Sequence, residues 1–256
     1  VLNFNSKKII KIKNPKNVLG GKGANLAGMG RLGLPVPPGF IISTEVCELF
    51  YKNKKKLPKK VLKNIELELK NIEKLTDKKF GDLKNPLLVS VRSGARVSMP
   101  GMMDTILNLG LNDQTVKALS KKTSNGRFAK DSYRRFVQMY SNVVLGIEGH
   151  LFEGMIDNHK LNKGVLLDTE LGENDWDELI KRFKELIKKK TKKDFPQNVK
   201  EQLYGAISAV FLSWDSQRAK TYRKLNQIPE HWGTAVNVQS MVFGNMGNDC
   251  STGVVF

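Results

Sequence analysis

The sequence predicts an α+β fold, and two features of its hydrophobic pattern indicate this class. Short apolar runs typical of strands lie near both ends of the 256-residue chain. From about 112 to 225 the apolar residues instead recur at intervals of three and four, as they do in helices. We therefore expect strands at both ends of the chain and a helical insertion between them.

Three segments before residue 80 have recognisable patterns. GGKGANLAGMGRLG (20–33) indicates a loop that leads into a short helix, with Gly33 at its end. PVPPGFIIS (35–43) indicates a turn followed by a strand. The segment 58–76 predicts an amphipathic helix, because its apolar residues share one face. These residues are Leu62, Ile65, Leu69 and Ile72.

A strand and a loop are expected next. LLVSVR (87–92) has the compact apolar character of a buried strand and ends on Arg92. SGARVSMPGMMDT (93–105) has no periodicity, so we expect a loop there.

The second half of the chain is predominantly helical until strands return. The periodicity predicts the helices 126–145, 150–160, 175–190 and 197–225. TAVNVQSMVF (234–243) and TGVVF (252–256) predict strands, joined by the glycine-bearing turn GNMGNDCS.

The net charge of +18 raises the possibility of a nucleic-acid-binding protein. Residues 51–79 and 181–200 each carry a net +7, so two stretches hold most of the excess, and both are predicted helix faces. They lack the interleaved aromatics and glycines that nucleic-acid binding favours. We interpret them as solvated surface and expect any affinity for DNA or RNA to be weak and lost as salt rises.

Nothing in the sequence indicates secretion, a membrane or a metal. The start of the chain has no apolar run of signal-peptide length, and no stretch approaches the ~20 apolar residues of a membrane-spanning helix. Cys47 and Cys250 form no metal spacing or disulfide framework, which favours a cytoplasmic location. We predict structural roles for His150, His159 and His231.

Three segments have residue types that suit phosphate or nucleotide binding. Gly20 to Gly23 combine close backbone approach, a helix start and the mobile charge of Lys22, although a plain turn explains such a loop equally simply. Arg92 at the end of a buried strand needs an anion, for which Asp104 is the simplest internal candidate. Met99, Met102 and Met103 fit an adenine pocket or ordinary core packing. The glycine-bearing turn within 234–256 offers backbone N–H groups to phosphates, but many hairpins share this pattern.

Taken together, these segments resemble the amino-terminal nucleotide-binding domain of the pyruvate, phosphate dikinase family, over nearly the whole chain. The resemblance is carried by LGGKGANLAGM, GLPVPPGFIISTEVC, VSVRSGARVSMPGMMDTILNLGLND, FAKDSYRRFVQMYSNVVLG and HWGTAVNVQSMVFGNMG. The stretch RSGARVSMPGMMDT distinguishes this family from the related phosphoenolpyruvate synthases.

The resemblance implies an incomplete ATP-grasp nucleotide-binding domain with a helical inserted subdomain. The switch in periodicity near 112 and the return of strands after 230 predict a first subdomain over 1–111, a helical insertion over 112–197 and a return to the first subdomain over 198–243. The segment 244–256 would then begin the second lobe of the fold. Complete members interconvert ATP, phosphate and pyruvate with AMP, diphosphate and phosphoenolpyruvate through a phosphohistidine on a separate domain.

The resemblance also implies a nucleotide site. Lys22 and Arg92 would hold the phosphates and stabilise charge during transfer. The segment from Gln239 to Val242 would run along the adenine, and Thr252 with Gly253 would cover the phosphates. The implied nucleotide-binding residues are Lys22, Arg92, Met103, Asp104, Thr105, Gln239, Met241, Val242, Thr252 and Gly253.

The chain departs from the family pattern in two ways. Ser251 stands where the family has a glycine, which restricts this phosphate loop. The chain stops at Phe256, before the family's acidic Mg²⁺ ligands, the phosphate-accepting histidine and the pyruvate-binding barrel. We therefore expect an incomplete, monomeric piece of a homodimeric enzyme, without dikinase turnover alone. The alternative is a non-catalytic binding module derived from the ATP-grasp fold.

Overall fold

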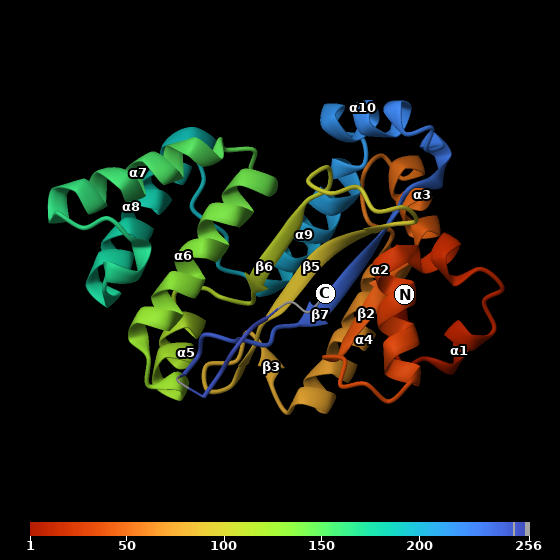
Figure 1. The fold of residues 1–256 in the computed structure, drawn as a ribbon, viewed down its shortest axis with the longest axis horizontal. Helices are drawn as coiled ribbons and strands as arrows, with labels where there is room; N and C mark the ends of the chain where they lie inside the picture. The colour runs from red at the N-terminus through yellow and green to blue at the C-terminus, as the bar shows by residue number, and fades with distance from the viewer. Residues whose placement is uncertain (248, 254–256) are drawn as a thin grey trace. The chain divides into compact units, whose positions relative to one another are not determined.

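A computed structural model describes residues 1–247 and 249–253, and it divides the chain into two compact units. The first unit comprises Val1–Lys78, Val89–Thr105 and Leu203–Ser240. The second unit comprises Lys79–Leu88, Ile106–Gln202 and the segment that begins at Met241. Figure 1 shows the elements of both units along the chain. The mixture of helices with an antiparallel sheet confirms the predicted α+β class. The division into four subdomains that was predicted from the sequence stays a prediction.

The first unit is built on an antiparallel sheet. Its strands run in the order β1-β2-β7-β5. The last strand in sequence, β7, therefore lies between β2 and β5. Their bounds are β1 Leu2–Asn3, β2 Gly39–Ile42, β5 Val89–Ala95 and β7 Thr234–Ser240. Asn237 on β7 pairs with Ile41 on β2 and with Arg92 on β5. Side chains of paired residues point to the same face of a sheet, so these three share one face.

Helix α2 (Pro15–Arg31) replaces the glycine loop that the sequence predicted at 20–23. Its helical geometry is interrupted at Gly20, where φ is 70° and ψ is 170°, a combination that essentially only glycine adopts. Gly33, at φ 78°, follows the end of the helix as predicted. The predicted loop is therefore a single-residue break, and Lys22 lies in the first turn of the helical segment after it.

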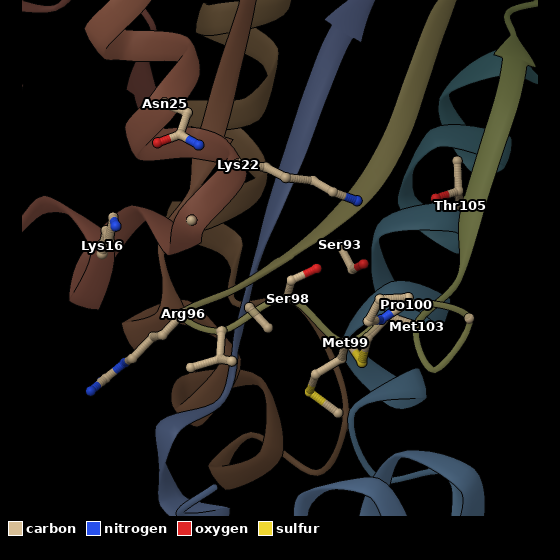
Figure 2. Close-up of a pocket in the computed structure, with 14 residues that line it drawn as sticks. Lys16, Lys22, Asn25, Ser93, Arg96, Ser98, Met99, Pro100, Met103 and Thr105 are labelled. Carbon is tan, nitrogen blue, oxygen red and sulfur yellow. The ribbon is translucent and has the colours of Figure 1, made fainter. Parts of the chain in front are cut away.

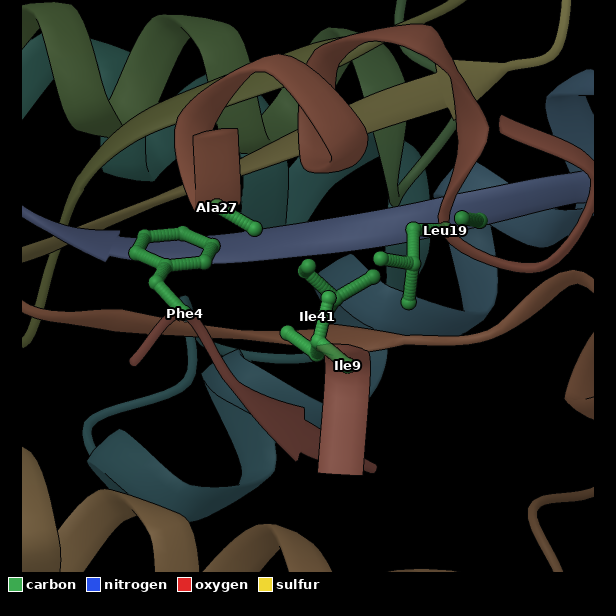
Figure 3. Close-up of a cluster of buried hydrophobic side chains, with 6 residues drawn as sticks. Phe4, Ile9, Leu19, Ala27 and Ile41 are labelled. Carbon is green, nitrogen blue, oxygen red and sulfur yellow. The ribbon is translucent and has the colours of Figure 1, made fainter. Parts of the chain in front are cut away.

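A small apolar cluster holds α2 against the sheet. Figure 3 shows that Leu19 and Ala27 from α2 meet Ile41 of β2 and Phe4 from the amino-terminal segment. Ile9 of the short helix α1 (Lys7–Ile10) completes the labelled cluster. All five side chains are at most 3% exposed, so burial of apolar area stabilises this position of α2 over β2.

The remaining helices of the first unit are amphipathic and mostly as predicted. Helix α4 confirms the helix expected at 58–76, but the one expected at 197–225 is interrupted after Ser213. The Oγ of Ser216 accepts a hydrogen bond from the N–H of Ala219 and so begins a new helix, a local cap that the apolar stripe did not reveal. The bounds are α3 Thr44–Lys52, α4 Lys59–Thr76, α9 Val199–Ser213, α10 Gln217–Leu225 and the 3₁₀ turn η2 Glu230–Trp232.

The second unit is mainly helical. Residues 112–197, all of which are described, contain helices and one 3₁₀ turn but no strand. The predicted helices are present, together with an unpredicted α5, whose polar sequence has too few apolar residues for a clear period. The helices are α5 Thr115–Thr123, α6 Gly126–Val143, α7 Gly149–Lys163, η1 Asp168–Glu170 and α8 Glu173–Thr191. The short parallel pair β3 Lys79–Phe80 and β4 Pro86–Leu87 also belongs here.

Several predicted strand ends were wrong. Strand β5 continues through Ala95, so the loop expected at 93–105 spans only 96–104, and Thr105 begins β6 (Thr105–Leu109). Strand β7 ends at Ser240 rather than at 243, and Thr252 and Gly253 lie outside any strand. The rest of that predicted strand, 254–256, lies outside the described residues. No helix in the described part of the chain has both the length and the apolar character needed to cross a membrane.

A buried polar cluster in the second unit joins α7 to α8. Asp175, 7% exposed, accepts hydrogen bonds from Lys163 at 2.7 Å and from the backbone N–H of Gly172 at 2.8 Å, and it lies 2.9 Å from the Nε2 of His159. Burial raises the pKa of Asp175, but the hydrogen bonds from Lys163, His159 and Gly172 outweigh it and lower the pKa to about 2. His159 thus has the structural surroundings that the sequence predicted.

We expect Asp175→Asn to destabilise the second unit by about 2 kcal/mol at neutral pH. The pKa of Asp175 falls from 3.8 to about 2 on folding, and each unit of such a decrease stabilises the folded state by about 1.4 kcal/mol. The stabilisation is complete above the unfolded pKa near 4 and disappears as pH falls toward 2. Urea unfolding from pH 6 to pH 2 should therefore show the difference between the wild type and the variant shrinking to nothing. A difference that stays constant over this range would contradict the prediction.

Candidate functional site

The first unit contains a cavity of about 510 Å³ formed by α2, the end of β5 and the loop 96–104. Its lining combines cationic, hydroxyl and thioether side chains with backbone. The lining residues are Lys16, Gly21, Lys22, Asn25, Ser93, Ala95, Arg96, Val97, Ser98, Met99, Pro100, Gly101, Met103 and Thr105. In Figure 2, Lys22 extends across the cavity toward the side of Ser93 and Thr105. We call this space the lysine cleft.

The break at Gly20 creates the cleft by letting α2 approach β5 closely. An added Cβ on Gly20 would lie 1.7 Å from the carbonyl oxygen of Gly94, so only glycine fits there. The helical segment then restarts beside the strand, and Gly21 and Lys22 fall in its first turn. The free N–H groups and the positive dipole end of a helix start attract anions, so this wall of the cleft favours a negatively charged ligand.

The charges of the lining agree with that preference. Lys16, Lys22 and Arg96 are cationic, and no Asp or Glu is among the lining residues. Partial burial and the nearby positive charge of Arg92 together lower the pKa of Lys22. A polyanion placed in the cleft would relieve this repulsion, whereas a neutral ligand would leave it in place.

Arg92 lies in a different position from the one predicted. It occupies the middle of β5 rather than its end, and its side chain is exposed. Its pairing with Asn237 places it on the face covered by α2, since a Cβ on Gly23 of that helix would lie 3.0 Å from Asn237 Oδ1. Arg92 therefore lies on the same side of the sheet as Lys22 and close enough to affect its pKa, although it does not line the cleft itself.

Asp104 is the partner of Arg218 and not of Arg92. The two side chains form an ion pair, and the N–H of Asp104 also donates to the Oγ of Ser213. Burial raises the pKa of Asp104 and the positive charge of Arg218 opposes that shift. Asp104 thus anchors the end of the loop to α9 and α10 and is absent from the cleft lining.

Two methionines give the cleft an apolar wall. Met99 is buried in a core cluster with Trp214, Ala219 and Ile228, and Met103 packs against that cluster. Both also line the cleft, so each methionine packs in the core and forms part of the cleft wall. The sequence left these two functions as alternatives.

The structure brings Lys22, Met103 and Thr105 to the cleft and leaves the other predicted site residues elsewhere. Gln239 on β7 donates a hydrogen bond to the carbonyl of Pro37. The remaining predicted residues belong to the second unit: Met241, Val242, Thr252 and Gly253. Val242 is 73% exposed, and the N–H of Met241 donates to the carbonyl of Leu88.

Lys16, Asn25 and Arg96 also line the cleft, and none of them was predicted from the sequence as a site residue. Asn25 lies three residues after Lys22 on the same helical segment, where side chains share a face, so helical spacing could have found it. Arg96 stands in the segment recognised as distinctive, but the expected loop gave no direction for its side chain. Across the part of the chain that the structure describes, no group of three or more His, Cys, Asp or Glu residues could hold a metal ion. No magnesium ligand is therefore assigned to these residues.

Comparison with known proteins identifies the family of this chain. Residues 16–79 and 53–256 match the family described as the pyruvate phosphate dikinase AMP/ATP-binding domain. The chain is 54% identical over 242 residues to the pyruvate, phosphate dikinase of Clostridium symbiosum, covering 94% of this chain and 28% of that protein. It is 52% identical to the enzyme of Entamoeba histolytica, covering 94% and 28%, and 52% identical to the chloroplastic enzyme of Flaveria pringlei, covering 95% and 25%.

The chain thus spans about a quarter of the length of these curated relatives, and the match includes every element around the lysine cleft. The resemblance stated from the motifs is confirmed over nearly the whole sequence. This chain belongs to the family of the pyruvate phosphate dikinase AMP/ATP-binding domain.

Proposed function

We propose that the lysine cleft binds the phosphates of ATP and that the chain supplies this part of a nucleotide site to a pyruvate, phosphate dikinase. The observation that carries the proposal is the cleft itself, with three cationic side chains, no carboxylate and a helix start in its lining. Such a lining suits a polyphosphate, because charge-assisted hydrogen bonds from Lys and Arg are the strongest that a protein offers to phosphate oxygens.

In this proposal the side chains have distinct functions. Lys22 holds the phosphates, and Arg92, which lies outside the cleft lining, adds positive potential that offsets the charge that develops during phosphoryl transfer. Met103 and Thr105 contribute to the wall of the cleft, and Asp104 fixes the loop that carries them. For the complete enzyme we propose, from the family resemblance alone, that the segment from Gln239 to Val242 contacts the adenine and Thr252 with Gly253 the phosphates; none of these residues lines the lysine cleft.

The reaction proposed for the complete enzyme transfers the ATP β-phosphoryl group through a phosphohistidine on another domain to pyruvate. It gives phosphoenolpyruvate, AMP and diphosphate, and it is reversible. Mg²⁺ is the expected metal, with its ligands outside the described residues of this chain. The proposed partners are the phosphohistidine domain and the pyruvate-binding barrel of a homodimeric cytoplasmic enzyme.

A nucleotide titration of the isotope-labelled chain, followed by NMR, tests the proposal. We expect the affinity to decrease from ATP to AMP to adenosine, because each phosphate lost removes contacts with the cleft cations. For this chain alone ATP should bind in the millimolar range, around −4 kcal/mol. The shifted backbone signals should come from 20–25 and 93–101. Adenosine binding as tightly as ATP, or shifts confined to the lysine-rich helices α4 and α8, would contradict the proposal.

A further inference from the structure

A second cavity, of about 390 Å³, lies in the first unit among α3, α10 with the connection that precedes it, and η2. Arg96 is the one lining residue that it shares with the lysine cleft. We call it the tryptophan cavity, because Trp214 and Trp232 both line it. Its lining residues are Thr44, Glu45, Cys47, Glu48, Tyr51, Lys52, Arg96, Trp214, Asp215, Lys220, Arg223, Glu230, His231, Trp232 and Gly233.

Arg223 is a buried guanidinium that receives negative potential from Glu230 and Asp215 but has no carboxylate in direct contact among the described residues. It is 2% exposed, and its Cζ lies 4.1 Å from the centre of the Trp214 ring. Nη1 donates to the carbonyl of Trp214, but buried Nε has no acceptor, and in the described part of the chain Arg223 makes no ion pair. A guanidinium cannot lose its charge, so leaving it buried without an anion is costly.

Arg96 approaches the same cavity in a similar way. Its Cζ lies 5.0 Å from the centre of the Trp232 ring, and its buried Nε also has no acceptor. Figure 2 shows the guanidinium pointing away from Lys22 and Ser93. Two arginines, each stacked on an indole ring and neither in an ion pair with another described residue, therefore line one cavity.

The other charges of the lining limit the kind of ligand. The carboxylates of Glu48 and Asp215 are paired with Lys52 at 2.6 Å and with Lys220 at 2.8 Å. Glu45 and Glu230 balance Arg96 and Arg223 in number, so the lining has no net charge when His231 is neutral. A polyphosphate, which suits the cationic lysine cleft, would bring several negative charges into a lining that has no cationic excess to balance them. A single negative charge would not meet the same barrier.

We propose that the tryptophan cavity binds a small organic carboxylate with a flat apolar body. Its carboxylate is held by the guanidinium groups of Arg96 and Arg223, and its body lies along Trp214, Trp232 and the buried thiol of Cys47. Arginine is suited to this task because its planar fork matches the two oxygens of a carboxylate. The ligand class differs from that of the lysine cleft, so the proposal stands apart from ATP binding.

Benzoate is the probe, and its binding is followed through the indole N–H signals of the labelled chain. We expect benzoate to shift the signals of Trp214 and Trp232 and to leave Trp176 of α8 unchanged. Arg223→Gln should weaken binding at least tenfold. Glu230→Gln should strengthen it severalfold, because this exposed carboxylate contributes the largest negative potential at Arg223 and competes with the ligand.

Two controls make the result decisive. Lys22→Met should leave benzoate affinity unchanged, and Glu185→Gln on α8 should do the same, since neither residue lines the cavity. Because Arg223→Gln alters a buried group, the exposed Glu230→Gln is the variant whose effect does not depend on repacking. Absence of shifts at Trp214 and Trp232, no gain in Glu230→Gln, or a loss of benzoate binding in Lys22→Met would overturn the proposal.

Discussion

Gly20→Ala is expected to destabilise the first unit by about 3 kcal/mol or more. Two independent costs add up at this residue. Its φ of 70° with ψ of 170° is a conformation that alanine adopts only under strain. An alanine Cβ would also lie 1.7 Å from the carbonyl oxygen of Gly94, so α2 and β5 would have to separate. Urea unfolding followed by tryptophan fluorescence measures the loss.

Gly28→Ala is the matched control because it lies in the same helix. Its added Cβ meets no atom within 4 Å, and the backbone there is helical. Alanine is the better helix former by about 0.5–1 kcal/mol, so this variant should be slightly more stable than the wild type. If both substitutions lowered the free energy of unfolding equally, the loss would come from replacing any glycine of α2 and not from the close approach of Gly20 to Gly94.

Lys22→Met is expected to reduce ATP affinity by tenfold to a hundredfold, which corresponds to about 1.5–3 kcal/mol for a hydrogen bond to a charged group. Methionine keeps the length and apolar stem of the side chain and removes only its charge. The side chain is exposed and makes no ion pair within the described residues, so the fold should be unaffected. NMR titration with ATP measures the change, and a thermal unfolding curve checks that the variant is intact.

Lys60→Met on α4 provides the comparison for Lys22. It removes one charge from the same unit at a place that lines neither cavity. It should change ATP affinity only through the long-range potential, by less than twofold at physiological salt, where exposed charges are screened within about 8 Å. An equal loss in both variants would mean that ATP responds to net charge alone and would remove the lysine cleft from the proposal.

The hydrophobic spacing predicted several helices because those elements bury one face each. Helices α4 and α8 repeat apolar residues at three and four, and both formed close to the expected bounds. The failures came where a local cap or a long-range strand pairing outweighed the pattern. Ser216 begins a separate α10 inside a stripe that looked continuous, and β5 runs on through Ser93, Gly94 and Ala95 because β7 pairs with them.

The candidate site was predicted less completely than the fold. Lys22, Met103 and Thr105 were named from the motifs, and the structure brings them to one cleft. Lys16 and Arg96 had no signal of their own, because whether a charged side chain points into a cavity depends on the backbone that carries it. The prediction that Asp104 is an internal partner of Arg92 was also wrong. Asp104 forms an ion pair with Arg218, which lies on α10 more than a hundred residues further along the chain.

The sequence by itself determined the family, the α+β class, and the glycine and lysine at the break in α2. These properties depend on residue identity and short-range spacing, which can be observed in the chain directly. Only the tertiary structure decided that Gly20 lies against Gly94, that Arg96 is shared by two cavities, and that Arg223 is buried against the Trp214 ring. Each of these depends on contacts between segments distant in sequence, and the physical reason is that packing selects one partner for a side chain from many that its chemistry allows.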